Sequence, residues 1–212
     1  SFATSFPMPT PSRSCASSSG STMAKKNTAT DNVTPLHAKK RKVNLVSGTM
    51  LDVFDQGPAT SAYFAPVIRD VAVAQNGIVY IADGIGRIRK VDPATHIINT
   101  VVGGIGIGFG GDGGPAVAAR LNNPAGMALD GAGNLFVADR GNNRIRKVTI
   151  ATGIISTIAG NGTIVAPAEG AIATSTGIIA PNDLVVDNMG NVYISSAALH
   201  ALYKVTAATG II

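Results

Sequence analysis

The side chains of this chain that are able to do chemistry are few, and they do not form a catalytic pattern. His37, His96 and His200 are scattered, with no Ser/His/Asp or Cys/His set in register with them. Cys15 is the only cysteine, so neither an internal disulfide nor a cysteine-rich metal site can form. The sequence therefore predicts no catalytic residue.

One glycine-rich run, Gly110-Gly111-Asp112-Gly113-Gly114, has the composition of a phosphate or calcium loop. A phosphate loop needs a helix with Lys and Ser/Thr directly after it, and Pro115 follows instead. A calcium loop needs several oxygen ligands, and Asp112 supplies one. We interpret the run as a flexible connector and expect neither a cofactor nor a metal there.

A second group of oxygen-bearing side chains lies near a predicted strand, at Asn182, Asp183 and Asp187. Each is explained most simply as a turn or strand-end residue. Together they leave open an alternative function, in which they contribute ligands to a metal-dependent site.

The elements that position these residues repeat along the chain. Arg89-Lys90-Val91 returns as Arg146-Lys147-Val148, and after the same interval it returns again as Tyr203-Lys204-Val205. A fixed period of this size, about 57 residues, indicates a repeat architecture.

Within one repeat, four short β-branched and aromatic runs alternate with Gly/Asn turns, which predicts an antiparallel meander. In the middle copy the runs are Pro124–Asp130, Asn134–Asp139, Arg144–Val148 and Ile154–Ala159. A four-stranded sheet cannot bury both faces alone, and radial stacking of such sheets gives a β-propeller. The aligned aromatics Tyr80, Phe136 and Tyr193 are then expected to pack between blades.

The middle copy closely resembles the NHL-repeat family. The motifs that carry the resemblance are Leu121–Asp130, Gly133–Asp139, Asn142–Val148 and the connector Gly108–Ala116, and it extends over about residues 48–212. It implies a propeller, most often six-bladed, that serves as a recognition platform. Relatives are fused to kinase, ubiquitin-ligase or cell-surface modules, and some bind RNA.

The meander places the turn between the second and third strands on the same rim as the long connection to the next blade. Loops on a rigid scaffold are where recognition concentrates. The candidate contact residues on this rim are Asp112, Arg120, Arg140, Asn142 and Asn143. The alternative, that they are solvated turn residues, stays open.

Asp83 and Asp139 end the second strand of their copies, and we expect each to hold the following turn through backbone N–H groups. The third copy departs from this pattern because Ser195-Ser196 replaces the Ala-Asp pair. We therefore expect a looser third blade.

The charge distribution argues against nucleic acid as a ligand of the repeats. Residues 1–50 hold seven of the 17 Lys/Arg residues and one of the 12 acids, which leaves ten basic and eleven acidic residues for the rest. A phosphate-binding face needs clustered positive charge, so RNA binding is the third function considered.

Residues 1–40 are rich in Ser, Thr, Ala, Pro and Lys, which predicts a disordered tail. The stretch before Asp31 contains no acid and fits an organelle transit peptide, and Lys39–Val43 fits a nuclear-import patch. No secretory signal and no apolar run long enough to span a membrane are present. The compartment stays open.

The prediction for the fold is an all-β partial propeller over residues 41–212, with three four-stranded blades at about 66–120, 121–178 and, incomplete, 179–212. The chain stops at Ile212, where a fourth strand should begin, which indicates truncation and self-association through exposed blade edges. We expect a non-catalytic scaffold that binds a protein or a carbohydrate. The alternative is a metal-dependent propeller hydrolase or lyase of the lactonase kind.

Overall fold

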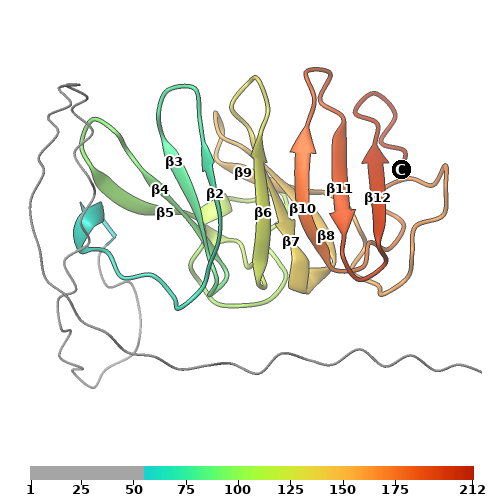
Figure 1. Ribbon diagram of the computed structural model, residues 1–212, viewed down its shortest axis with the longest axis horizontal. Helices are drawn as coiled ribbons and strands as arrows, with labels where there is room; N and C mark the ends of the chain where they lie inside the picture. Colours follow the sequence, from blue (N-terminus) through green and yellow to red (C-terminus); the bar gives the residue numbers. More distant parts are fainter. Residues whose placement is uncertain (1–54) are drawn as a thin grey trace, which may run out of the picture. The chain divides into compact units, whose positions relative to one another are not determined.

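The computed structural model describes residues 55–212, and the account of the fold is confined to them. The predicted disordered tail, the transit and nuclear-import signals, Cys15 and His37 all lie outside the described residues. The described part is all-β, as the sequence predicted, with antiparallel sheets that stand side by side in chain order (Figure 1).

The first sheet contains five strands in the order β1-β5-β4-β3-β2. Their bounds are β1 Gly57–Pro58, β2 Ile68–Val73, β3 Val79–Asp83, β4 Arg87–Val91 and β5 Ile97–Gly103. The four long strands form the predicted meander, and the short β1 adds an edge beside β5.

The second sheet contains four strands in the order β6-β7-β8-β9, and the third contains three in the order β10-β11-β12. Their bounds are β6 Pro124–Leu129, β7 Leu135–Asp139, β8 Arg144–Thr149, β9 Ile154–Ala159, β10 Pro181–Val186, β11 Val192–Ser196 and β12 Ala201–Val205. In the third sheet, the described residue at the position of a fourth strand is Ile211, which bridges Thr206 and Ile172.

The first strands of the three sheets lie next to one another, β2 beside β6 and β6 beside β10. Each contains a bulge at the same place, between Ile68 and Asp70, between Pro124 and Met127, and between Pro181 and Asp183. A bulge turns side chains away from the regular alternation of a strand. At one end, each of these three adjacent strands therefore carries residues whose side chains depart from the regular alternation.

Two apolar layers hold the sheets together. The layer between the first and second sheets includes Tyr80, Ile88, Leu135 and Val137. The layer between the second and third includes Phe136, Ile145, Leu184, Val192 and Ile194. The predicted packing role of the aligned aromatics is confirmed for Tyr80 and Phe136, which are both buried.

The described helices are single 3-10 turns at Ala59–Ser61, Ala116–Ala118 and Arg140–Asn142, labelled η1, η2 and η3. None of the helices within residues 55–212 has the length and apolar character needed to cross a bilayer.

Candidate functional site

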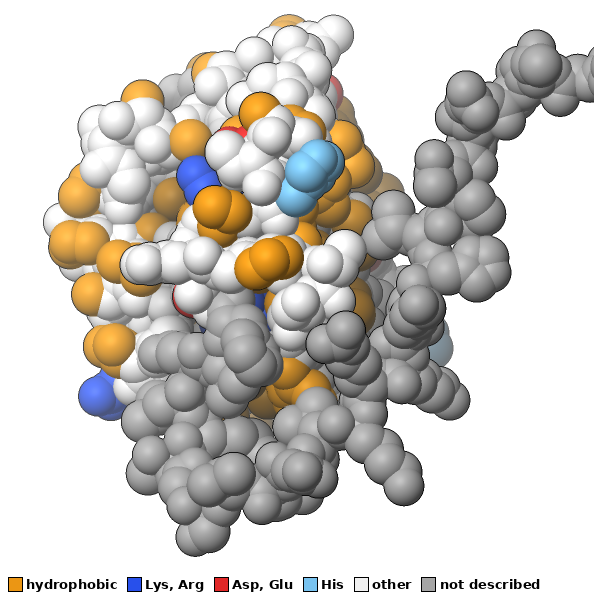
Figure 2. Space-filling view, turned by 90° about the vertical axis from the view of Figure 1, so that its left-hand side faces the viewer, with side chains coloured by type: hydrophobic (Ala, Val, Ile, Leu, Met, Phe, Trp, Pro, Cys, Tyr) orange, Lys and Arg blue, Asp and Glu red, His pale blue; other side chains and the backbone are white. Residues whose placement is uncertain are grey.

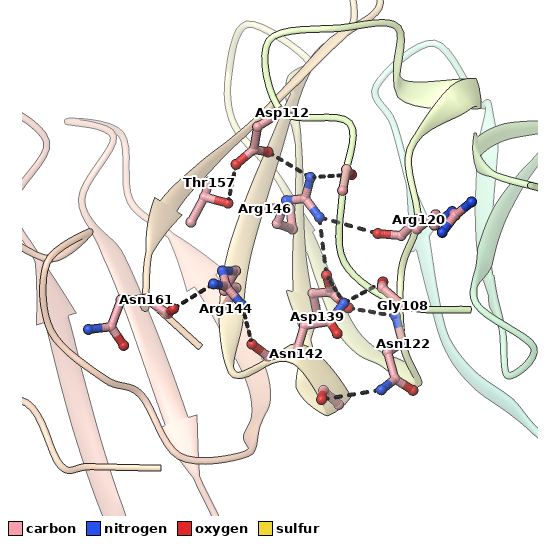
Figure 3. A network of polar contacts seen from close by, with 12 residues as sticks. Gly108, Asp112, Arg120, Asn122, Asp139, Asn142, Arg144, Arg146, Thr157 and Asn161 are labelled. Carbon is pink, nitrogen blue, oxygen red and sulfur yellow. Dashed lines mark hydrogen bonds and ion pairs between the residues drawn. The ribbon is translucent and has the colours of Figure 1, made fainter. Parts of the chain in front are cut away.

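The side chain of Arg146, on β8, fastens the long connector to the second sheet (Figure 3). This guanidinium is fully buried and forms an ion pair of 2.6 Å with Asp112. It also donates to the backbone oxygens of Gly110 and Arg120. The second carboxylate oxygen of Asp112 accepts from the hydroxyl of Thr157 at 2.6 Å. The connector is thus held by charge-assisted hydrogen bonds, which are the stronger kind.

We call the contacts of Asp112, Arg146 and Thr157 a latch. The first sheet contains the same latch at the equivalent positions, one repeat earlier. Arg89 donates to Asp55 through Nη2 at 2.8 Å, and Asp55 also accepts from the backbone N–H of Thr100. The latch residues therefore recur as sets, Asp55, Arg89 and Thr100 in one sheet and Asp112, Arg146 and Thr157 in the next.

The third sheet lacks this latch within the described residues, because Tyr203 and Glu169 occupy the arginine and aspartate positions. Glu169 is exposed. The connector before β10 is instead joined to the sheet at Ala173, which donates its N–H to Gly210, and at Gly170, which donates to Ile212.

The side chain of Asp139 does not hold the following turn by accepting backbone N–H groups of that turn, which corrects the sequence prediction. Its carboxylate is fully buried and accepts from the N–H of Asn122, the side-chain amide of Asn142 and the guanidinium of Arg146. A backbone hydrogen bond within the turn closes it, because the N–H of Asn143 donates to the carbonyl oxygen of Arg140. Burial raises the pKa of Asp139, and the donors from Asn122, Asn142 and Arg146 oppose that rise.

The equivalent residues of the other sheets join the same two chain segments. Asp83 accepts from the N–H of Ala65, which stands one repeat before Asn122, and it pairs with Arg87 at 2.9 Å. Ser196, which occupies the Asp139 position in the third sheet, donates its hydroxyl to the carbonyl of Ile179 at 2.6 Å. The third copy keeps this contact with donor and acceptor exchanged.

Three of the five predicted rim residues are taken up by internal contacts. Asp112 belongs to the latch, and Asn142 donates to Gly108 O at 2.7 Å as well as to Asp139. Asn143 adopts φ of 53° and accepts the N–H of Ala180. The turn therefore contacts the connectors on both of its sides, and the connectors and the turn lie at one rim.

The other two rim residues have side chains that stay available to a ligand. The side chain of Arg120 is exposed. Arg140 lines a pocket, and its Nε is buried with no hydrogen-bond partner among the described residues. An unsatisfied buried donor is costly, so a ligand that accepts from it would relieve that cost.

The pocket lies where the three bulged strands meet. It has a volume of about 210 Å³ and is lined by Arg69, Asp70, Ala125, Gly126, Arg140, Asn182 and Asp183. All of these except Arg140 lie at the bulges of β2, β6 and β10. Register equates Asp70, Gly126 and Asp183, so each sheet contributes the same position.

Gly126 allows β6 and β10 to approach closely at this pocket. A Cβ placed on it would lie 2.6 Å from the Cα of Asp183. On the other side, the carboxylate of Asp70 accepts the backbone N–H of Met127 at 2.6 Å and so bridges β2 to β6. The pocket walls are therefore fixed by backbone contacts.

The structure brings together two of the three candidate metal ligands. Asn182 and Asp183 line the pocket. Asp187 lies in the following turn, where it accepts the N–H groups of Met189 and Asn191. Among the described residues, no cluster of three or more His, Cys, Asp and Glu side chains is arranged to hold a metal ion.

Sequence reasoning did not identify Arg69 and Asp70 as site residues. A strand bulge brings them to the pocket, and no residue type in the sequence predicts a bulge there. The two described histidines occupy turn positions, His96 at φ of 57° and His200 at φ of 51°. His96 replaces Gly153 and His200 replaces Asn143, which are also left-handed.

Comparison with known proteins finds similarity to one family over part of the repeats. The family model of the Teneurin NHL domain matches residues 106–169. The chain is 37% identical over 84 residues to the chloroplastic protein Suppressor of Quenching 1 of Arabidopsis thaliana, which covers 39% of this chain and 8% of that protein. It is 40% identical over 91 residues to human Teneurin-4, covering 36% of this chain and 3% of that protein.

A solved structure with the same fold is a protein of unknown function from Bacteroides thetaiotaomicron. The superposition has a TM-score of 0.53 at 25% identity and covers 60% of this chain and 32% of that one. The chain thus spans less than a tenth of the two named relatives and about a third of this structure.

Proposed function

The chain belongs to the NHL-repeat family of β-propellers, and on this basis we propose that it is a non-catalytic scaffold that binds a protein or a carbohydrate. The binding surface in this proposal is the pocket at the bulged ends of β2, β6 and β10, together with the neighbouring rim. Function carried by loops and strand ends on a rigid framework is typical of such repeats.

The observation that carries the proposal is the guanidinium Nε of Arg140, which has no hydrogen-bond partner among residues 55–212 and belongs to a residue that lines a pocket with fixed walls. Arg69 also lines this pocket. Two guanidinium groups suit a carboxylate or another planar anion, which they bind with charge-assisted hydrogen bonds. Asn182 adds an amide that both donates and accepts.

The size of the pocket favours one group of a larger ligand. Typical small-molecule sites have volumes of about 300–1,000 Å³. A cavity of about 210 Å³ has room for a single acidic side chain or for one uronic-acid unit of a polysaccharide. The rim would then contact the remainder of the ligand.

Binding arrays test this proposal directly. Peptides and oligosaccharides, each with and without carboxylate groups, are screened against the chain, and hits are measured by calorimetry. We expect acidic hits whose affinity falls about tenfold or more in Arg140→Ala, as expected for an arginine contact at the centre of a binding surface. Lys204→Ala is the control, because that cation is exposed on β12 and lies outside both the pocket and the rim residues.

Two results would contradict the proposal. One is the absence of any acidic hit, and the other is an equal loss of affinity in Lys204→Ala. The second result would mean that the net positive charge of the chain, and not the pocket, sets the affinity.

A metal-dependent hydrolase or lyase is the alternative, and one observation favours it. Asp70, Asn182 and Asp183 share the pocket, and such oxygen ligands suit calcium or zinc. Thermal unfolding with either ion separates the two functions. The scaffold predicts an unchanged melting temperature, whereas an increase that Asp183→Asn abolishes would favour the enzyme.

A further inference from the structure

The connector after β9 contains the dipeptide Asn161-Gly162, whose main chain is held in place on both sides. The N–H of Asn161 donates to the carbonyl of Thr176, and its main-chain carbonyl accepts from the guanidinium of Arg144 (Figure 3). The main-chain nitrogen that follows an asparagine is able to attack the carbonyl carbon of its side chain. Glycine in the second position leaves that nitrogen unshielded, because it has no Cβ.

The side-chain carbonyl of Asn161 is polarised for such an attack. Its Oδ1 accepts two hydrogen bonds from Thr163, one from the backbone N–H at 2.9 Å and one from the hydroxyl at 2.6 Å. Nδ2 donates to the carbonyl of Ser175 at 3.0 Å, which fixes the orientation of the carboxamide. Donors that point at a carbonyl oxygen stabilise the negative charge that forms on it during attack, as in an oxyanion hole.

The attacking nitrogen, that of Gly162, lies beside a cation. The guanidinium of Arg144 approaches this glycine so closely that a Cβ on Gly162 would clash with its terminal nitrogens. Among residues 55–212 Arg144 has no carboxylate partner, and the N–H of Gly162 donates no hydrogen bond. A positive charge nearby favours the anionic form of the nitrogen, which is the form that attacks.

The chain contains one other Asn-Gly dipeptide, Asn76-Gly77 in the turn between β2 and β3, and its surroundings differ. Oδ1 of Asn76 accepts a single N–H, from Ile78 at 3.2 Å, and the N–H of Gly77 already donates to Ala74 O at 2.9 Å. A Cβ on Gly77 would meet the ring of Pro93 and no cation. Figure 2 looks onto this end of the molecule and shows hydrophobic side chains spread over it.

We propose that Asn161 is a site of spontaneous covalent modification, where the fold itself promotes deamidation. Solvent base removes the proton of the Gly162 nitrogen, which then forms a bond to Cγ of Asn161. The oxyanion of the tetrahedral intermediate accepts from Thr163. The Cγ–Nδ2 bond then breaks, and the amide group takes up a proton from solvent and leaves as ammonia. Water opens the resulting succinimide ring at either carbonyl, which gives aspartate or isoaspartate.

Both products place a new negative charge next to Arg144. Opening at the main-chain carbonyl gives isoaspartate and converts the oxygen that accepts from Arg144 into part of a carboxylate. A charge-assisted pair with the guanidinium then replaces a neutral acceptor. The same opening lengthens the main chain by a carbon atom, so the connector after Asn161 has to shift.

Incubation of the folded chain at mildly alkaline pH, followed by tryptic digestion and mass spectrometry, tests the proposal. Trypsin separates the two sites, because Asn76 falls in the peptide 70–87 and Asn161 in the peptide 148–204. Fragmentation locates the exchange of the amide for a carboxylate, and enzymatic methylation detects isoaspartate. We expect Asn161 to react about tenfold faster than Asn76 in the folded chain. In urea, where these contacts are lost, the two rates should converge.

Two variants test the groups that promote the reaction. Thr163→Val removes the hydroxyl donor, keeps the backbone N–H, and should slow the reaction at Asn161 about tenfold. Thr174→Val, at an exposed threonine of the same connector, is the matched control and should leave the rate unchanged. Arg144→Gln removes the charge and should also slow it. The rate at Asn76 in the same sample detects a loosened fold, which would raise that rate instead.

Three outcomes would overturn the proposal. They are a rate at Asn161 that does not exceed that at Asn76 in the folded chain, a ratio of rates that is the same in urea, and an unchanged rate in Thr163→Val. None of them involves the pocket lined by Arg140, so this proposal and the proposed function fail independently.

Discussion

The second and third sheets have the same strand register and different polar anchors. In the second sheet, Arg146 and Asp139 form a buried ion pair at 3.2 Å that also ties down the connector. In the third, Tyr203 and Ser196 stand at those two positions, and the hydroxyl of Ser196 donates a hydrogen bond to Ile179 O. The fold therefore does not depend on the ion pair.

This difference shows that the contacts that define a blade are not the contacts that hold its loops in place. Apolar faces recur in all three sheets, whereas the latch recurs in the two whose connectors carry Asp55 and Asp112. A buried charge is retained at a cost unless its partner is present. We therefore expect the latch arginine and its aspartate partners to be all present or all absent in a given blade.

The largest effect is expected from the removal of one charge from the second sheet. Asp139→Ala deprives the guanidinium of Arg146 of its fully buried partner and removes the acceptor of Asn122 N–H. We expect a loss of about 3–5 kcal/mol in the free energy of unfolding, measured by urea denaturation. Glu169→Ala, at an exposed carboxylate, is the control and should change it by less than about 0.5 kcal/mol.

A loss below about 1 kcal/mol for Asp139→Ala would mean that the ion pair is as replaceable within the second sheet as it is between sheets. The ion pair of the second sheet and the serine hydrogen bond of the third would then be interchangeable anchors.

A second change tests the contact between the two sheets themselves. Gly126→Ala places a Cβ against the backbone of Asp183, which is part of a strand and has little room to shift. We expect a loss of about 1–3 kcal/mol in the free energy of unfolding. Gly131→Ala is the matched control, because a Cβ there meets no atom within 4 Å. Equal effects of the two changes would rule out close packing of β6 on β10.

A third change tests the substitute anchor of the third sheet. Ser196→Ala removes one hydrogen bond from a residue that is 2% exposed. The expected loss is about 1 kcal/mol, smaller than that of Asp139→Ala because no charge is involved. Ser156→Ala, on the exposed side of β9, serves as the control. A loss as large as that of Asp139→Ala would contradict the weaker anchoring of the third sheet.

Most of the fold was predictable because apolar alternation and turn residues repeat in register. The predicted run Asn134–Asp139 became β7 at Leu135–Asp139, and Arg144–Val148 became β8 at Arg144–Thr149. Such patterns are local, so the sequence alone expresses them.

The candidate site was predictable only in part, because it depends on contacts between distant residues. Asp139 looked like a turn residue from its sequence neighbours, yet its partners include Asn122 and Arg146. The sequence predicts Arg140 as a contact residue from its place on the rim, and the structure places it in a pocket that Arg69 also lines. Propensity describes neighbours along the chain, whereas the register of three sheets decides which residues meet.

The smallest expected effect concerns a turn in the third sheet and its dependence on pH. The side-chain amide of Asn191 donates to Asp187 and lowers the pKa of that carboxyl below its ordinary value of 3.8. A lowered pKa in the folded state means that the charged form adds stability above the unfolded value, and that this is lost as pH falls through the folded pKa. The melting temperature of the chain should therefore exceed that of Asp187→Asn at neutral pH, and the difference should shrink below pH 3.8. A difference that stays constant across this range would show that the carboxylate charge does not stabilise the turn.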